Sequence, residues 1–471
     1  MTLLGLTGTT LLVLLLGVTL LVGFGADWLA VRFRIPDVLW LIGLGVLAGP
    51  VLGLLATGSL LLIAPVLGAA TLVLILFDAG IDLQLSEIRP YLGSALAFSA
   101  SVYFVSVGTL YLVAYFVLFP GHFVLSLLFA TALGCASGAV IIPLARRLGV
   151  GPDLRNFLQL DGAFEDAIAV VVVTTILALR APSSSSLALN VTASLVLPLP
   201  VGIALGLAAG LIWLLFLYSW QGRPFSALAT LGFLFVVYAV TEALGGSGIL
   251  AALVFGIVLG NEALVRRFLR RTRPFRISEE MRKVEVEIAF VLRAYFLFLI
   301  GMFASLADPG LGVGASVIVL VLLLLGLRGL VFRATTQPPK TPREWQGTVT
   351  ALYGRGLTSA VLLIVSVELI PAVSILFEPA ILLIVGTNVA MTVSLFARPV
   401  PRATRAAGQD RRWAEASPRY ISFTEADPRA PGALPDEDMP EPVPDPAPPP
   451  APDPARAPPP LPRIHQPPSP P

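Results

Sequence analysis

Hydrophobic runs follow one another along most of this chain, and short polar connections separate them. A helix of about 20 apolar residues is long enough to span the hydrocarbon layer of a bilayer, and about 13 runs have this length. The pattern therefore predicts an all-α polytopic membrane protein. The runs are residues 10–30, 36–54, 60–81, 92–119, 123–145, 158–179, 195–218, 226–244, 248–264, 286–306, 312–332, 346–370 and 373–396.

The connections between the runs predict the orientation of the chain. The first run has no basic segment before it and no cleavage site after it, so we interpret it as a retained helix and not as a signal peptide. Cytoplasmic connections carry an excess of Lys and Arg. This rule predicts an N-terminus outside and a C-terminus in the cytoplasm, because only Arg180 then falls in an outside connection. The inside connections then hold Arg32, Arg34, Arg89, Arg146, Arg147, Arg155, Arg223, the basic run that starts at Arg266, Arg333, Lys340 and Arg343. We interpret the run at Arg266 as a topology anchor, with a lipid or partner site as the alternative.

Composition supports a membrane protein and argues against several other functions. Of the 471 residues, 56% are hydrophobic and 13% are charged, which is more apolar than a soluble domain requires. The net charge of +2 gives no reason to expect a nucleic-acid partner. A single cysteine, Cys135, excludes an internal disulfide, and with only two histidines we expect neither a permanent metal site nor another cofactor. Nearly all basic residues are arginine, which suggests a GC-rich bacterial genome and hence the bacterial inner membrane.

The C-terminal part has a different composition from the rest of the chain. Residues 399–471 are rich in proline and poor in large apolar residues. Such a segment cannot form a core and favours extended polyproline conformations. We expect a transmembrane exchanger-type domain over 1–398 and a disordered cytoplasmic tail over 399–471.

The apolar run at 158–179 carries three carboxylates, Asp161, Glu165 and Asp166. Charged side chains within a membrane helix are costly and indicate function. Asp161 and Glu165 lie one turn apart on one face, with Asp166 about 100° round the helix from Glu165. Burial and mutual repulsion favour a bound proton or cation on at least one of them. Exchange of a proton for a cation at one carboxylate is the elementary step of an antiporter. The alternatives are an acidic face of a soluble helix, or structural carboxylates neutralised by buried arginines.

Two other runs are interrupted by small and polar residues. Residues 134–143 read GCASGAVIIP and contain Ser137, and residues 352–359 read LYGRGLTS and contain Arg355. Broken membrane helices are tolerated where they line a cavity, and corresponding breaks in two halves of a chain indicate inverted repeats with a binding site near the midplane. Each break taken alone is also compatible with a glycine that only allows close packing.

Two arginines in these apolar surroundings require partners. Arg328 lies in the run at 312–332, and Asp161 or Glu165 is the natural partner. An arginine does not release its proton, so Arg328 would hold one carboxylate ionised and leave another free to exchange. We expect Arg355 to stabilise the crossing of the broken helices in the same manner.

Five segments in this order resemble the monovalent cation/proton antiporters, most closely their bacterial sodium/proton exchanger branch. The resemblance implies a fold of about 13 helices with two crossing broken helices, a dimerisation domain, a moving core domain and elevator-like alternating access, in a homodimer. By the same resemblance Asp166 is the ion-binding aspartate, Asp161 replaces an upstream glutamate and Arg328 is its partner. Asp78 matches the acidic residue of a Phe-Glu-Gly-Gly pattern, and we expect it in the ion funnel. The segments are residues 34–55, 76–89, 160–171, 242–261 and 353–361.

Two positions depart from the family pattern. Glu165 replaces the Asn before the ion-binding aspartate, and in a related branch an acidic residue there accompanies electrogenic exchange. Ala136-Ser137-Gly138 replaces the Thr-Asp-Pro of the first broken helix, which removes a carboxylate. We therefore expect Asp166, Glu165, Ser137, backbone carbonyls and water as ligands, with Asp161 beside them, because oxygen ligands suit a hard cation.

The sequence thus predicts a secondary transporter that exchanges protons for Na⁺, or for K⁺ or Li⁺, and not an enzyme. A sodium-coupled organic-anion symporter would need a basic or amide-rich pocket. An intramembrane aspartyl hydrolase would carry its two acids on different helices. A cation channel or sensor would show flux without counter-transport.

Overall fold

The computed structural model describes residues 8–33, 35–53, 64–178, 197–219, 225–268, 279–304, 310–336 and 342–397, and the elements in these ranges are all helices. The all-α class predicted from the hydrophobic pattern is therefore confirmed. The proline-rich segment 399–471 lies outside the described residues, and its disorder stays a prediction.

Over its described residues, each predicted apolar run coincides with one helix or with consecutive helical segments, and one short helix lies between two runs. In chain order these are α1 (Gly8–Phe33), α2 (Asp37–Val46), η1 (Leu47–Val51), α4 (Ala64–Asp82), α5 (Leu85–Ile88), α6 (Leu92–Val113), η2 (Ala114–Leu118), α7 (Phe123–Leu133), α8 (Gly138–Arg147), α9 (Pro152–Ala178), α11 (Pro198–Ser219), α12 (Ser226–Ala243), α13 (Gly248–Gly260), α14 (Glu262–Phe268), α15 (Glu279–Met302), α16 (Gly310–Thr335), α17 (Trp345–Ala351), α18 (Leu357–Leu369), η3 (Pro371–Leu376) and α19 (Phe377–Ala397).

Within the described ranges, 7 helical segments are long and apolar enough to cross a membrane, and shorter apolar helices accompany them. Helices α9 and α15 have 27 and 24 residues, but both carry several charged side chains. Large apolar residues lie exposed on outer faces, for example Ile318, Val319 and Leu322 on α16, as expected where helices meet lipid. The chain is a multi-pass membrane protein, and the number of its spans stays a prediction.

Glycines bring α4 and α13 into backbone contact. A Cβ atom added to Gly80 would lie 2.3 Å from the carbonyl oxygen of Leu253, and one added to Gly256 would lie 2.2 Å from that of Phe77. Small residues allow membrane helices to approach in this way, and dispersion contacts then stabilise the pair. Helices α4 and α13 therefore pack backbone against backbone.

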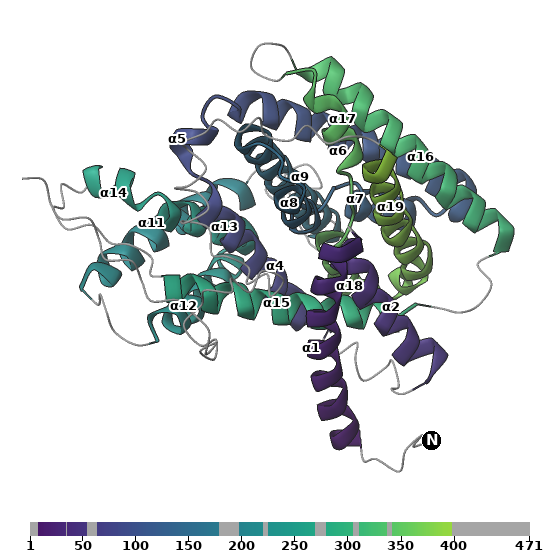
Figure 1. The fold of residues 1–471 in the computed structure, drawn as a ribbon, viewed down its shortest axis with the longest axis horizontal. Coiled ribbons are helices and arrows are strands. Elements are labelled where there is room, and N and C mark those ends of the chain that lie inside the picture. The colour runs from purple at the N-terminus through teal and green to yellow at the C-terminus, as the bar shows by residue number, and fades with distance from the viewer. Residues whose placement is uncertain are drawn as a thin grey trace, which may run out of the picture. The chain divides into compact units, whose positions relative to one another are not determined.

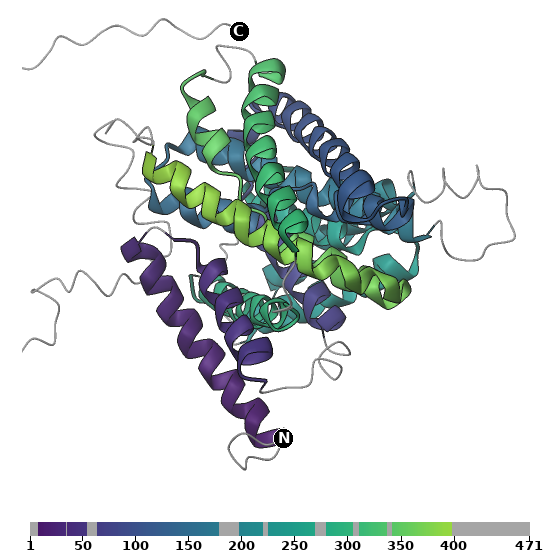
Figure 2. The same cartoon turned by 90° about the vertical axis from the view of Figure 1, so that its right-hand side faces the viewer.

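The described helices pack into two groups, which Figures 1 and 2 show from two sides. The scaffold group packs around α4 and α13 and consists of α1, α2, α4, α11, α12, α13 and α15. The site group packs around α6 and α9 and consists of α6, α7, α8, α9, α16, α17, α18 and α19, and α18 also packs against α4 of the scaffold group. In the site group, α6, the α7–α8 pair and α9 are followed later in the chain by α16, the α17–α18 pair and α19. The same order of helix, broken helix and helix therefore occurs twice.

Candidate functional site

The two breaks in the site group touch each other. Helix α7 ends at Leu133 and α8 begins at Gly138, while α17 ends at Ala351 and α18 begins at Leu357. The backbone N–H of Ser137 donates a hydrogen bond of 2.9 Å to the carbonyl oxygen of Gly354. The two unwound segments thus satisfy part of each other's backbone, as non-helical backbone inside a membrane requires.

Arg355 lies at this crossing and is fully buried. Its Nε donates to the carbonyl oxygen of Leu133, the last residue of α7, and its Nη2 donates to the hydroxyl of Tyr353. That hydroxyl lies 3.1 Å from the Oγ of Ser106 on α6. From α19, the side-chain N–H of Asn388 donates a hydrogen bond of 2.6 Å to the carbonyl oxygen of Arg355. The positive guanidinium therefore faces the negative end of the α7 dipole.

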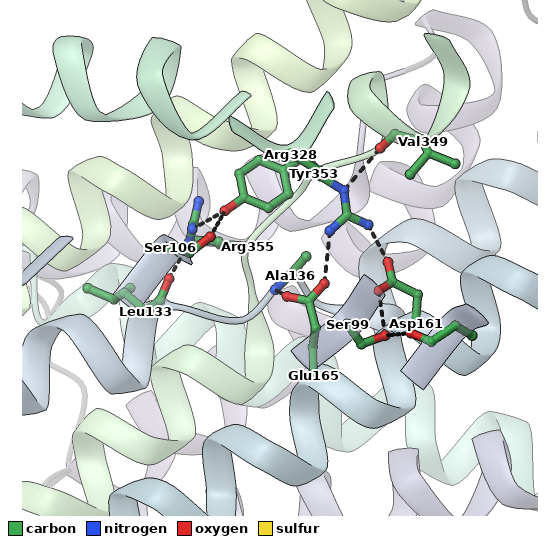
Figure 3. Close-up of polar contacts among 11 residues, drawn as sticks. Ser99, Ser106, Leu133, Ala136, Asp161, Glu165, Arg328, Val349, Tyr353 and Arg355 are labelled. Atoms are coloured by element: carbon green, nitrogen blue, oxygen red, sulfur yellow. Dashed lines mark hydrogen bonds and ion pairs between the residues drawn. The ribbon is translucent and has the colours of Figure 1, made fainter. Parts of the chain in front are cut away.

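The predicted carboxylates all lie on α9 and are almost completely buried, with Asp161, Glu165 and Asp166 exposed by 1%, 0% and 2%. Arg328 on α16 is also buried and forms ion pairs with two of them, with Asp161 and, at 2.8 Å, with Glu165. Its Nε donates to the carbonyl oxygen of Val349 at 3.0 Å. Figure 3 shows the guanidinium directed at both carboxylates. The sequence left open whether Arg328 pairs with Asp161 or with Glu165, and in the structure it pairs with both.

Further contacts fix this ion-paired group. The Phe98 and Tyr353 rings each lie 5.1 Å from the guanidinium carbon of Arg328, within cation–π range. The hydroxyl of Ser99 donates to Asp161 at 2.8 Å. The second oxygen of Glu165 accepts a hydrogen bond of 2.7 Å from the backbone N–H of Ala136, in the first break. Both oxygens of Glu165 are thus occupied, one by an arginine and one by the broken helix.

Asp166 lies in different surroundings from the other two carboxylates. Neither Arg328 nor Arg355 forms an ion pair with it, and its Oδ1 is buried without a hydrogen-bond partner. The backbone N–H of Gly138 and the hydroxyl of Thr358 face its carboxylate. A Cβ atom added to Gly162 would lie 2.6 Å from the Cα of Gly138, so these two glycines allow the N-terminus of α8 to reach the Asp166 face of α9.

The two half-helices that begin at the breaks each bring a buried hydroxyl to this region. Ser137 directly precedes α8 and is 1% exposed, and its Oγ has no hydrogen-bond partner. Thr358 is the second residue of α18 and is 0% exposed, and its Oγ1 has none either. Buried polar atoms without partners are rare in folded proteins and call for an explanation.

Asp78 lies on α4 and not on α9, the helix that carries the three carboxylates. It is half-buried on α4, in the scaffold group, and is not among the partners of Arg328 or Arg355. Its place in an ion funnel stays a prediction.

Several contributors to the site were not found by sequence reasoning, among them Ser99, Tyr353, Thr358 and the backbone N–H of Ala136. Tyr353 and Thr358 belong to the segment 352–359 that was recognised as a break, so their positions in the sequence already indicated that they could lie at the site. Ser99 lies on α6 in an ordinary apolar helix, and only tertiary packing brings it to Asp161.

The family model described as "Sodium/hydrogen exchanger, transmembrane" matches residues 16–398. The chain belongs to the sodium/hydrogen exchanger family. The match covers both groups of helices and both breaks, so the resemblance seen in the sequence is confirmed, and the family consists of transporters and not of enzymes.

Solved structures show the same fold. The sodium proton antiporter MjNhaP1 from Methanocaldococcus jannaschii at pH 8 superposes with a TM-score of 0.69 at 17% identity, covering 82% of this chain and 100% of that one. A second structure, a three-dimensional electron-microscopy map of MjNhaP1, gives a TM-score of 0.65 at 18% identity and covers 83% and 96%.

Curated relatives match over a smaller part of the chain. The K(+)/H(+) antiporter NhaP2 of Shewanella baltica is 25% identical over 237 residues, which is 49% of this chain and 40% of the relative. The Na(+)/H(+) antiporter 1 of M. jannaschii is 24% identical over 165 residues, 35% of this chain and 39% of the relative. The match thus spans about two fifths of the length of each of these relatives.

The geometry of the site separates carboxylates that have a fixed positive partner from one that has none. Arg328 cannot lose its proton under ordinary conditions, so Asp161 and Glu165 have a permanent countercharge. Asp166 has none among the described residues. A buried carboxylate without a fixed partner is neutralised by a proton or by a bound cation. The arrangement can therefore hold one or the other at Asp166.

Proposed function

We propose that this protein exchanges protons for monovalent cations, with Na⁺ as the first candidate and K⁺ or Li⁺ as alternatives, by alternating access at a site around Asp166. The observation that carries the proposal is the difference between Asp166 and its neighbours. Asp161 and Glu165 share Arg328, whereas Asp166 has an unpartnered oxygen in a buried, oxygen-rich position.

In this mechanism Asp166 binds either the cation or a proton, and both compete for the same oxygens. Ser137 would supply a second oxygen to the cation from the start of α8. Asp161 and Glu165, which the sequence predicted as ion-binding residues, keep the site negative enough to attract a cation while Arg328 limits their repulsion. Because protons compete with the cation, a fall in pH raises the cation concentration needed for half-maximal exchange. No separate pH sensor is required for this behaviour.

The relatives named as antiporters for Na(+) and for K(+) both match this chain, and they support exchange without selecting the cation. The all-oxygen donor set suits the alkali cations in general. The organic-anion symporter is less well supported, because Arg328 is bonded to two carboxylates and a carbonyl oxygen, and Arg355 to a carbonyl oxygen and a hydroxyl. Of the two described guanidiniums at the site, this leaves only the Nη1 of Arg355 without a partner. An aspartyl hydrolase is also less well supported, since the three carboxylates lie on one helix.

The test is proton flux in proteoliposomes that contain a pH-sensitive dye. Na⁺, K⁺ and Li⁺ are added in turn, with the membrane potential either clamped or free. We expect at least one cation to dissipate the pH gradient in the wild type, and Asp166→Asn to abolish the response while the protein still folds. Asp153→Asn is the matched control, because Asp153 is an exposed carboxylate in the first turn of the same helix.

Three outcomes separate the candidate functions. Full activity of Asp166→Asn would remove Asp166 from the mechanism. Cation flux without proton flux in the wild type would favour a channel or sensor. If one proton exchanges for one cation at Asp166, the rate is independent of the potential; a dependence on the potential would instead assign a second titrating carboxylate, with Glu165 the first candidate.

Three further properties are inferred from the resemblance and the pattern of basic residues. We infer a homodimer in a bacterial inner membrane, with the N-terminus outside and the C-terminus in the cytoplasm. Chemical crosslinking in native membranes tests the dimer, and a reporter fused after residue 398 tests the side of the C-terminus.

A further inference from the structure

Thr358 departs from the usual behaviour of a buried helical threonine. Threonine hydroxyls within helices commonly bond the carbonyl oxygen four residues earlier. Thr387 and Thr392 on α19 do so, at 2.9 and 2.8 Å. Thr358 lies at the start of α18, and the carbonyl four positions earlier, that of Gly354, accepts the N–H of Ser137 across the crossing. Its hydroxyl is 0% exposed and has no hydrogen-bond partner.

Ser137 shows the same departure at the other break. A serine that precedes a helix usually accepts a hydrogen bond from an N–H of the first turn. Ser247 does this at the start of α13, where Leu250 donates at 3.3 Å. Ser137 occupies the equivalent position before α8, yet its side chain makes no such bond. At the start of each half-helix there is therefore a hydroxyl that does not form the hydrogen bond usual for its position.

Both hydroxyls are adjacent to the Asp166 region. Thr358 faces the Asp166 carboxylate, without the geometry of a formed hydrogen bond. A Cβ atom added to Gly356, two residues before Thr358, would lie 3.5 Å from the Oγ of Ser137. Asp166 itself has an unpartnered Oδ1. Buried oxygens without partners thus gather at the crossing, one directly before α8, one on α9 and one on α18, and the Oδ1 of Asn388 on α19 is a further one near Gly354.

We propose that Thr358 is a cation ligand that completes the exchange site together with Asp166 and Ser137, and that it contributes to the choice among alkali cations. The inference rests on the proposed function. Thr358 supplies an oxygen from the second broken helix, and the first broken helix offers only the hydroxyl of Ser137, since Ala136-Ser137-Gly138 contains no carboxylate.

A hydroxyl suits both states of the exchange cycle. It can direct lone pairs at a bound cation, or donate its proton to a carboxylate oxygen when the cation has left. Because Thr358 lies in the first turn of α18 while Asp166 belongs to α9, a cation held between them would also connect the two halves of the site group. The distance between two helices then affects which ion size fits, so the hydroxyl is a determinant of selectivity.

The experiment compares Thr358→Val with Thr358→Ser, which keeps the hydroxyl. Thr392→Val is the matched control, because its buried hydroxyl bonds only the carbonyl oxygen of Asn388 in its own helix. Proton flux in proteoliposomes gives the half-maximal concentration of Na⁺, K⁺ and Li⁺. Equilibrium binding of radioactive Na⁺ to the purified full chain gives an affinity that does not depend on transport.

For Thr358→Val we expect the half-maximal concentration of the best cation to rise about tenfold, the scale of one lost contact to a charged group, and the order of preference among the cations to change. Thr358→Ser and Thr392→Val should remain close to wild type. Unchanged affinity and preference in Thr358→Val would overturn the proposal. Equal loss of binding in Thr358→Ser would also overturn it, because the hydroxyl would then be irrelevant.

Two other results keep the interpretations apart. If Thr358→Val does not transport, its binding of radioactive Na⁺ decides: binding at the wild-type concentration overturns the proposal, and binding weakened about tenfold supports it. If the wild type binds a cation but no cation drives proton flux, the proposed exchange function fails, and the comparison of binding still tests Thr358.

Discussion

The guanidinium of Arg328 compensates two buried carboxylates, Asp161 and Glu165. Both were predicted from the sequence as candidate partners. Asp161 and Glu165 lie one helical turn apart, so a forked side chain opposite them reaches both. The sequence left the choice between them open, because it does not contain the rotation of α16 relative to α9. Thr358 was missed for a related reason: a threonine in an apolar run resembles many others, and only the crossing removes its usual acceptor.

We predict that Arg328→Gln destabilises the fold strongly. The change leaves Asp161 and Glu165 buried beside each other without a countercharge, and loss of one partner of a buried ion pair costs about 3–5 kcal/mol. Thermal unfolding of the detergent-purified protein measures the effect. Arg146→Gln is the control, since its side chain is 43% exposed and exposed pairs contribute about 0–1 kcal/mol.

A triple variant checks the cause of this loss. Arg328→Gln combined with Asp161→Asn and Glu165→Gln removes all three charges, and it should recover most of the stability. If the triple variant is as unstable as the single one, packing of Arg328 between Phe98 and Tyr353, and not charge compensation, is the main contribution.

Among the helices, the contact of α8 with α9 decides where the N-terminus of α8 lies. We predict that Gly162→Ala lowers the rate of exchange by about tenfold or more, because the new methyl group would lie 2.6 Å from the Cα of Gly138 and move α8 away from Asp166; displacements of about 1 Å can have effects of this size. Proton flux in proteoliposomes measures it. Gly108→Ala on α6 is the control, since no atom lies within 4 Å of its added Cβ. Equal rates in both variants would show that this close contact is not required.

The breaks themselves were predictable from their small residues, whereas the π-helical turns η1 and η2 were not. The run at 36–54 was predicted as one membrane helix, and the structure has a π-helical turn, η1, within it that contains Pro50. Proline lacks the N–H that a regular helix needs at this position, and the backbone adjusts around it. The pattern of apolar residues continues through the turn, so hydrophobicity alone does not reveal it.

For the molecule as a whole, the ion pair of Asp82 with Arg146 at 2.5 Å joins the scaffold group to the site group. Alternating access requires these groups to move relative to each other. We predict that Asp82→Cys combined with Arg146→Cys, linked by a bifunctional thiol reagent as long as the replaced ion pair, stops exchange.

Each single cysteine variant, treated with the same reagent, is the control for modification alone. The native Cys135 is completely buried and should not react in the folded protein. Exchange at the wild-type rate in the linked protein would contradict relative movement of α4 and α8.

The hydrogen bonds across the crossing also constrain how the chain is made. The side chain of Arg355 and its acceptor, the carbonyl oxygen of Leu133, are 222 positions apart in the sequence. The N–H of Ser137 likewise has its acceptor, the carbonyl oxygen of Gly354, in a part of the chain that is synthesised much later. A polar backbone group left unsatisfied in lipid costs several kcal/mol. During translation the first broken helix therefore leaves the ribosome long before its partner exists. Until α17 and α18 have been synthesised, we expect water or the insertion machinery to provide hydrogen-bond partners for these backbone groups. We expect a chain that stalls before α17 to lack these partners permanently and to be degraded.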